Sequence, residues 1–239
     1  MTDNVLNIWV YLAETPLLWL TVTLVVYMGA EWLSASLKRN PAANPVVLTA
    51  AVLIVLLHVT GTSYKTYFDG AQFVHFLLGP ATVALAVPLY RNLGIVKKSL
   101  LPMGAALFAG SITAAASAVG IAWAMGAPPE LLASLAPKSA TTPIAMELAR
   151  NLGGIASLTA VLVVFTGMVG AIIVTPTMNL LGIKDFAARG FAVGVASHGI
   201  GTARAFQVSE LAGTFAGIAM GLNGALTSLL VLIWIALHV

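Results

Sequence analysis

Cysteine is absent from this sequence of 239 residues, and charged side chains make up only 8% of it. Without cysteine there are no disulfide bonds, thiol catalysis or cysteine-ligated metals, and the redox compartment stays undetermined. Soluble domains carry roughly 25% charged residues, whereas 59% of this chain is hydrophobic. Several uncharged runs also reach the roughly 18 residues that a membrane-spanning helix needs. The composition therefore predicts a polytopic membrane protein.

The few charges sum to +3, but their placement does not indicate nucleic-acid binding. Most basic residues lie in short loops between apolar runs, as the positive-inside rule expects. The N-terminus carries Asp3 and Glu14 before its first apolar run and lacks the basic region of a cleaved signal peptide. We expect the chain to interact with a lipid bilayer and not with nucleic acid.

Motifs of catalysis and of nucleotide binding are also lacking. No Gly-Lys-Ser/Thr phosphate loop occurs, so ATP-driven work within this chain is not expected. The four histidines lack the spacing of metal ligands. Lys138-Ser139 and Ser197-His198 place a serine beside a base, but neighbouring helical residues point about 100° apart, and no acidic partner is evident. We expect no enzyme, no cofactor and no metal site.

Hydrophobic runs predict an all-α fold with about six transmembrane helices. The runs cover residues 16–36, 46–60, 72–90, 100–125 and 156–180, and a last span ends at His238. The second run is short enough to be partly re-entrant. The third should bend at Pro80, because proline removes a backbone donor.

Small residues predict close packing between some of these helices. They fill residues 109–117 of the fourth span and recur at Gly213, Gly217 and Gly221 in the last. We expect residues 1–98 to form scaffold and oligomerisation spans, and residues 99–239 to form the transport core.

Two polar breaks interrupt the second half of the chain. They are residues 137–143, PKSATTP, and residues 197–204, SHGIGTAR. Each lies in a broken region, 128–154 or 187–213, whose apolar arms are roughly half as long as a spanning helix. Such breaks are tolerated at membrane depth only where they are buried in protein or line a water-filled cavity. We interpret the two breaks as halves of one binding site.

Each broken segment either crosses the membrane or enters and returns as a re-entrant hairpin. Arms of about seven to nine residues reach roughly 11–13 Å, which favours hairpins with tips near the midplane. Two hairpins separated by one span form an inverted pair. Hairpins leave only Lys65 and Arg150 outside, whereas crossing helices would bring Arg150 inside but move Lys184 and Arg189 outside, so the positive-inside rule also favours hairpins. This topology places both termini outside.

Under the hairpin interpretation, each tip starts a half-helix whose N-terminus points to the membrane centre, which makes an anion site. Thr142 is the expected cap and Pro143 the first helical residue, while Gly199 and Gly201 should let the second tip turn sharply. The predicted substrate-binding residues are Lys138, Ser139, Thr141, Thr142, Pro143, Ser197, His198, Gly199, Gly201, Thr202 and Arg204. Their hydroxyls bind the anion, Lys138 and Arg204 neutralise it, and His198 is placed for proton coupling.

Ordinary structural roles stay open for the charged residues of this set. Lys138 can extend to an interface, Arg204 can pair with Glu147 or Glu210, and Glu147 can pair with Arg150 three residues on. An ionisable group at membrane depth is nevertheless a functional candidate.

Three motifs are similar to those of the LrgB/CidB family, which includes YohK and the C-terminal half of the plastid glycolate/glycerate translocator. They are residues 79–90, GPATVALAVPLY, residues 137–145, PKSATTPIA, and residues 196–204, ASHGIGTAR. The resemblance covers about residues 15–235. It implies a multi-pass protein of the bacterial inner membrane with a small LrgA/CidA-type membrane partner, and it assigns the tip residues to a transport site.

The resemblance and the breaks together lead to two functional hypotheses. The first is a secondary transporter of small 2-hydroxy or 2-oxo monocarboxylates (glycolate, glycerate, lactate or pyruvate), working by alternating access with the anion between two half-helix N-termini. Coupling to protons or sodium stays open. The alternative is a holin/antiholin-like modulator of murein hydrolase export and cell lysis. In both cases a homo-oligomer is expected.

Overall fold

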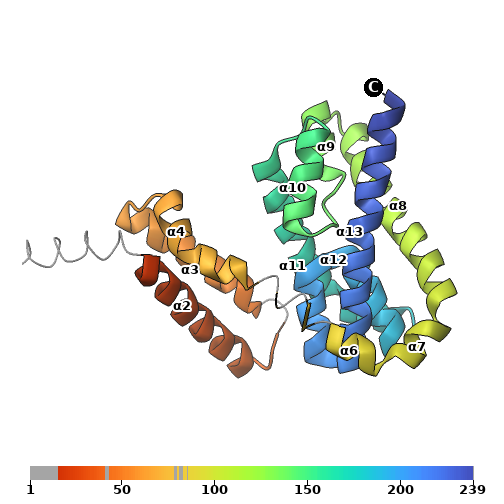
Figure 1. Ribbon diagram of the computed structural model, residues 1–239, viewed down its shortest axis with the longest axis horizontal. Coiled ribbons are helices and arrows are strands. Elements are labelled where there is room, and N and C mark those ends of the chain that lie inside the picture. The colour runs from red at the N-terminus through yellow and green to blue at the C-terminus, as the bar shows by residue number, and fades with distance from the viewer. Residues whose placement is uncertain (1–15, 41–42, 78–79, 81–82, 85, 239) are drawn as a thin grey trace, which may run out of the picture. The chain divides into compact units, whose positions relative to one another are not determined.

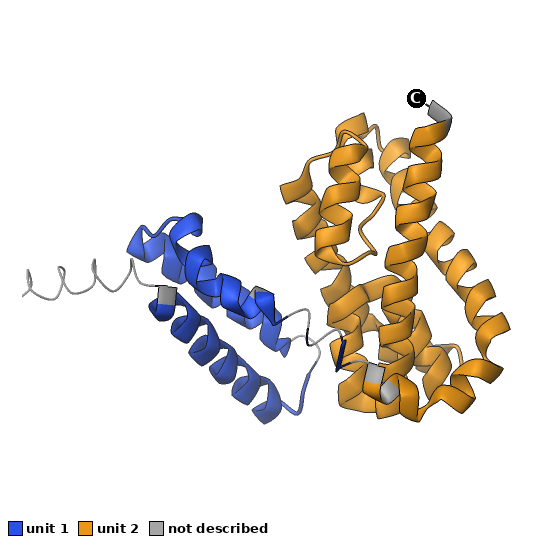
Figure 2. Ribbon diagram, in the orientation of Figure 1, with its two compact units in different colours: residues 1–84 blue, residues 85–239 orange. Residues whose placement is uncertain are grey.

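The computed structural model describes residues 16–40, 43–77, 80, 83–84 and 86–238. Within these residues every regular element is an α-helix (Figure 1). Two compact units divide the chain, residues 1–84 and residues 85–239 (Figure 2). The predicted all-α membrane fold is confirmed. The functional division predicted at residue 98 concerns roles and stays a prediction.

The first unit contains α2 (Pro16–Ser36), α3 (Pro45–Thr60) and α4 (Tyr64–Phe76). Helix α3 begins where the side chain of Asn44 accepts a hydrogen bond from the backbone N–H of Val46, and it ends at Gly61 in the left-handed conformation (φ 64°). Trp19 of α2 is fully buried and meets Tyr67 of α4 edge to face. This contact explains why α4 starts inside the polar stretch 61–70, because its aromatic residues gain a packing partner on α2.

The second unit starts with two short helices, α6 (Ala86–Arg91) and α7 (Leu93–Lys98), and continues with α8 (Leu100–Ala124). Short helices α9 (Pro129–Leu135) and α10 (Thr142–Asn151) follow. The chain ends with α11 (Ala156–Leu180), α12 (Phe186–Val208) and α13 (Glu210–His238). The largest buried cluster joins α7, α8, α12 and α13 around Phe191, Phe215 and Leu226.

Four helices are long and apolar enough to cross a membrane: Leu17–Ser36, Leu100–Ala124, Ala156–Leu180 and Glu210–Ala236. Helix α3, predicted as a short span, is apolar with 16 residues. The third predicted span, 72–90, is not one described helix, because α4 ends at Phe76 and α6 begins at Ala86. Residues 78–79, beside the bend expected at Pro80, lie outside the described residues.

Close helix packing depends on glycines of α12 more than on the predicted stripe of α13. A Cβ atom at Gly190 or Gly194 would overlap backbone carbonyl groups of α13, so these two helices touch backbone to backbone. In the predicted stripe, Gly213 is buried against Phe206, whereas Gly221 has no neighbour within 4 Å. The packing prediction is therefore correct for Gly213 and wrong for Gly221.

Candidate functional site

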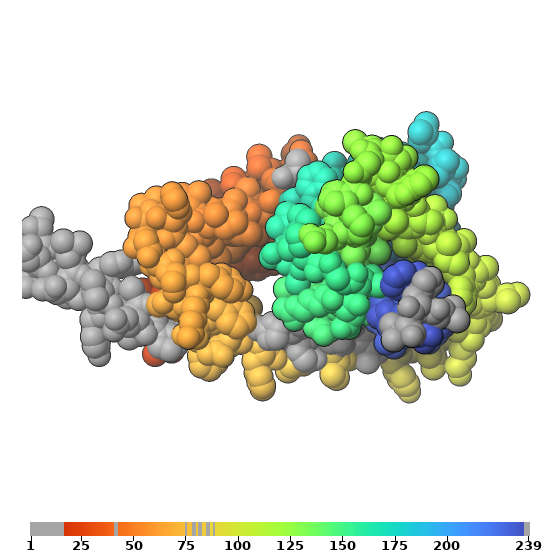
Figure 3. Space-filling view, turned by 90° about the horizontal axis from the view of Figure 1, so that it is seen from above, coloured from red at the N-terminus to blue at the C-terminus, as the bar shows by residue number. Residues whose placement is uncertain are grey.

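The first broken region folds as a hairpin with α9 and α10 as its arms. Ser134, near the end of α9, accepts a hydrogen bond of 2.8 Å from the backbone N–H of Ile155, and its carbonyl accepts another of 3.1 Å from the hydroxyl of Thr159. These bonds attach the hairpin to the first turn of α11. Seen from above in Figure 3, the green residues of this hairpin lie beside the blue end of α13.

The tip of this hairpin, between α9 and α10, is buried in the protein. Pro137, Ser139 and Ala140 are each at most 9% exposed. The side-chain amide of Asn223, on α13, donates a 2.9 Å hydrogen bond to the carbonyl of Ser139. Its carbonyl oxygen accepts a 2.5 Å bond from the hydroxyl of Ser111 on α8. A buried polar relay therefore joins α8, α13 and the first tip.

The second broken region, α12, is also a hairpin, because its two halves lie against each other. The backbone leaves helical geometry at Ser197 (φ −130°, ψ 16°) and at His198 (φ 39°, ψ −134°). Beyond them the chain returns, so that a Cβ atom at Gly201 would lie 3.0 Å from the carbonyl oxygen of Val193. Residues eight apart in one straight helix are about 12 Å apart along its axis, which excludes a continuous crossing helix. Both breaks are therefore hairpins in this structure, and their re-entry from one side of a membrane stays a prediction.

The tip of α12 fits into two glycine positions of α11. A Cβ atom at Gly167 would lie 2.6 Å from the ring of His198, and one at Gly170 would overlap the hydroxyl of Ser197. The Nε2 atom of His198 lies 2.8 Å from the carbonyl oxygen of Val163. Because a carbonyl only accepts, Nε2 must carry the proton. The hydroxyl of Ser197 is buried and has no hydrogen-bond partner among the described residues.

Both tips contact α11 and α13, and they share Val163 of α11 as a neighbour. The side chain of Val163 packs with Ala140 and Ala145 of the first hairpin, while its carbonyl oxygen bonds to His198 of the second. In the first tip, the ammonium group of Lys138 lies 3.4 Å from the hydroxyl of Ser139. In Figure 1 the first hairpin enters the unit from the upper end and α12 from the lower end, as an inverted pair does.

Residues in neighbouring turns of α13 contact the two tips. The sulfur of Met220 lies 3.9 Å from the hydroxyl of Thr202 and would lie 3.8 Å from a Cβ atom at Gly199. One turn later, Asn223 holds Ser139. The two half-helix starts are therefore brought to one level of the protein.

Most of the predicted site residues belong to these two tips, and Arg204 stands apart. It lies on the returning arm, six residues beyond His198, which is roughly 9 Å along a helix. Its Nη1 atom donates to the side chain of Gln207, and it lines a small cavity together with Arg189 and Val208. The predicted alternative for Glu147 is observed, because its carboxylate forms an exposed 3.1 Å ion pair with Arg150.

Local details differ from the prediction at both turns. Thr141, not Thr142, is the N-cap residue of α10, its side chain makes no capping hydrogen bond, and Pro143 falls in the first turn after Thr142. The expectation that Gly199 and Gly201 make the second turn is wrong. Ser197 and His198 make it, and Gly201 instead permits the close approach of the first arm.

Sequence reasoning missed the residues that hold the tips. Asn223 is the one amide in the last apolar span, and an isolated polar residue at membrane depth is a usable signal. Gly167 and Gly170 gave no such signal, since glycine is common in membrane helices. Among the described residues, no group of three or more His, Asp or Glu side chains could hold a metal ion.

Comparison with known proteins places this geometry in a family context. Residues 23–237 match the LrgB-like family. Bacillus subtilis YwbG is 35% identical over 208 residues, covering 87% of this chain and 92% of that protein. Holin-like protein CidB of Staphylococcus epidermidis is 30% identical, and that of Staphylococcus aureus 28%, each covering 92% of this chain and 96% of the relative. No solved structure matches the chain.

Proposed function

Because this chain belongs to the LrgB-like family, we propose that it works in a bacterial membrane as a multi-pass protein of the holin-like class. Relatives that bear the name holin-like protein CidB align with 92% of the chain. This class is what the comparisons support most directly. It leaves open whether the protein permeabilises or restrains the membrane, or instead carries a solute.

Within that class, the geometry favours a carrier of small 2-hydroxy or 2-oxo monocarboxylates. The observation that carries this proposal is Val163, which packs against the first tip and bonds to the second. Convergence of two re-entrant tips on one level of a spanning helix is the arrangement of secondary transporters. The start of α10 has no side-chain cap, so its N–H groups can bind a carboxylate.

The charged and hydroxyl groups of the tips suit a small monoanion. Lys138 is the basic residue of the first tip, and its ammonium group lies 3.4 Å from the hydroxyl of Ser139. Hydroxyls of Ser139 and Ser197 are close to the two half-helix starts and suit a substrate that carries a second oxygen beside its carboxylate. Alternating access then requires the unit with both hairpins to move as a body against the N-terminal spans.

The alternative is a holin/antiholin-like modulator that transports no substrate and acts with a small LrgA/CidA-type partner. The names of the relatives favour it. The free-energy cost of burying polar residues at membrane depth argues against this alternative. Self-association of apolar helices needs no buried Ser197 hydroxyl and no strained φ of 39° at His198.

The deciding experiment is uptake of radiolabelled glycolate into vesicles containing this chain alone or with its partner, with and without a proton gradient. Saturable uptake that pyruvate or glycerate competes with supports the carrier. Uptake only with the partner supports a two-part carrier. Absence of uptake by folded protein, together with size-independent dye leakage, supports the holin-like modulator and overturns the carrier proposal.

A further inference from the structure

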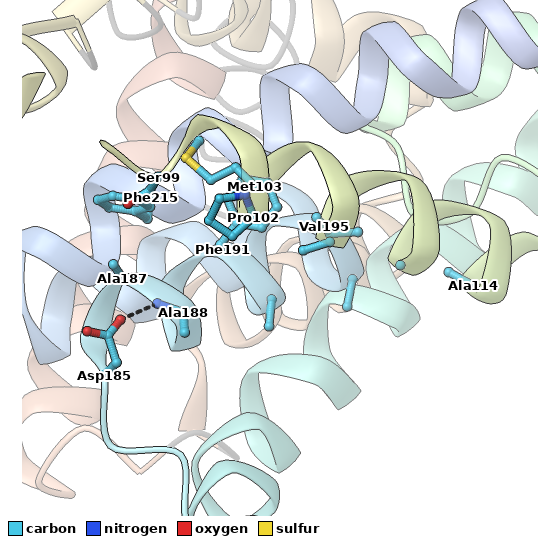
Figure 4. A pocket seen from close by; sticks show the side chains of 14 residues that line it. Ser99, Pro102, Met103, Ala114, Asp185, Ala187, Ala188, Phe191, Val195 and Phe215 are labelled. Atoms are coloured by element: carbon cyan, nitrogen blue, oxygen red, sulfur yellow. Dashed lines mark hydrogen bonds between the residues drawn. The ribbon is translucent and has the colours of Figure 1, made fainter. Parts of the chain in front are cut away.

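A groove of about 440 Å³ lies between α8 and the first arm of α12, and extends from Ser99 and Asp185 to Ala196, next to the second tip (Figure 4). The two helices run side by side here, since a Cβ atom at Gly110 would lie 3.1 Å from Val195. Its lining is apolar except at one end, where Ser99 begins α8 and Asp185 precedes α12. We call this feature the α8–α12 groove.

Positive charge gathers at that polar end. Lys97 and Lys98 immediately precede Ser99, and Lys184 immediately precedes Asp185. All three lysines are exposed, and none forms an ion pair or hydrogen bond with another described residue. Such lysines also set membrane topology, but topology alone needs no apolar groove beneath them.

The carboxylate of Asp185 does not cancel this charge. Its Oδ1 atom accepts a 2.7 Å hydrogen bond from the backbone N–H of Ala188, as the cap of α12 (Figure 4). A capping carboxylate is balanced by the positive end of the helix dipole. The mouth of the groove therefore keeps a surplus of positive charge.

A second groove supplies an internal comparison. It lies between the later part of α8, the α9 arm and the end of α13, also measures about 440 Å³, and contains Ala133 and Trp234 in its lining. Its nearest charged residue in the sequence is the exposed Glu130, next to the lining residue Pro129. Arg150, on the same hairpin, is engaged with Glu147. The two grooves are alike in size and apolar lining, and they differ in charge.

We propose that the α8–α12 groove binds one acyl chain of an anionic phospholipid, whose phosphate is held by Lys97, Lys98 and Lys184. An apolar groove under a basic cluster at the membrane surface is the chemistry that recognises an anionic lipid. Three ammonium groups that form no other ion pair among the described residues suit the phosphate of an anionic lipid. In a neutral zwitterionic lipid, the amine or choline of the same headgroup already balances the phosphate charge. The uncharged second groove takes acyl chains without headgroup preference.

A second copy of the chain fits this groove less well. In a two-fold dimer with parallel orientation in the membrane, the lysine clusters of both copies lie on the same side and are brought together. Like charges in proximity oppose association. A lipid phosphate removes this repulsion, whereas another copy adds to it.

The test is native mass spectrometry of the full chain, released from micelles that contain equal amounts of phosphatidylglycerol and phosphatidylcholine. We expect the protein to retain phosphatidylglycerol several-fold over phosphatidylcholine. The triple variant Lys97→Gln, Lys98→Gln, Lys184→Gln should lose this preference, while Lys38, Arg39 and Arg91 remain to set topology. Ala192→Leu, which fills the groove, should reduce retention of phosphatidylglycerol.

Matched controls are Lys65→Gln, an exposed lysine of α4, and Ala133→Leu, which fills the second groove. Both should keep the wild-type preference. Equal retention of the two lipids by the wild type overturns the proposal. A preference for phosphatidylglycerol that persists in the triple variant also overturns it. The same holds if Ala133→Leu and Ala192→Leu lose this preference equally. A lipid-free dimer that Ala192→Leu dissociates would assign the groove to a second copy and also overturn it. None of these readouts depends on transport.

Discussion

Asn223 of α13 donates a 2.9 Å hydrogen bond to the carbonyl of Ser139, 84 residues earlier in the chain. Through its other amide atom it accepts from Ser111 of α8. Asn223 and Ser139 are 1% and 9% exposed, so water cannot replace this bond at either residue. The first tip is thereby fixed to the longest helix of the unit.

Asn223→Ala should lower the free energy of unfolding by about 1–3 kcal/mol, because it leaves a buried carbonyl and a buried hydroxyl without partners. Thermal unfolding in detergent measures the effect. Asn151→Ala, at the exposed end of α10, is the matched control and should change stability little. Equal melting curves for the two variants would show that the relay adds nothing to stability.

Gly170→Ala and Gly167→Ala should each destabilise the protein by about 1–3 kcal/mol, the usual cost of overpacking a filled site. The new methyl groups would collide with Ser197 and with His198. Gly221→Ala is the control, since that glycine has open space around it. It should be neutral or stabilise α13, given the better helix propensity of alanine. Destabilisation by Gly221→Ala as large as by Gly170→Ala would contradict the fit of the second tip into α11.

The boundaries of the long helices and the hairpin form of the breaks could be predicted from sequence, because the lipid environment makes uncharged length and polar interruptions informative. Helices α2 and α11 begin and end as predicted, at Pro16–Ser36 and Ala156–Leu180. The residues that make the second turn could not be predicted. His198 adopts a positive φ, which a non-glycine residue seldom does, because Val163 and Gly167 of a distant helix receive its ring. Such a contact leaves no local pattern.

Lys138→Ala should weaken substrate binding more than Arg204→Ala, if the chain is a carrier. Lys138 lies in the tip, whereas Arg204 lies on the returning arm beside Gln207. Loss of a charged hydrogen bond costs about 1.5–3 kcal/mol, so KM for uptake should rise roughly ten-fold or more in Lys138→Ala. Both variants must first be shown to be folded by size-exclusion chromatography. A larger rise of KM in Arg204→Ala than in Lys138→Ala would show that Arg204, rather than Lys138, is the main cation of the substrate site.

His198→Gln should retain the fold and most uptake, whereas His198→Ala should lose both. The ring donates from Nε2 to the carbonyl of Val163, and the amide of glutamine can donate in the same way without ever carrying a proton in exchange. Alanine leaves the buried turn without this bond and with an empty space against Gly167.

The measurement is uptake at several pH values together with thermal unfolding of each variant. If His198→Gln is stable but no longer couples uptake to a proton gradient, the ring acts as a proton carrier and its contact with Val163 is secondary. If His198→Gln and the wild type respond alike to the gradient, the ring is a fixed donor that holds the second tip, and coupling must be sought elsewhere. The first result would require proton uptake at Nδ1, because the bond to the carbonyl of Val163 already holds a proton on Nε2.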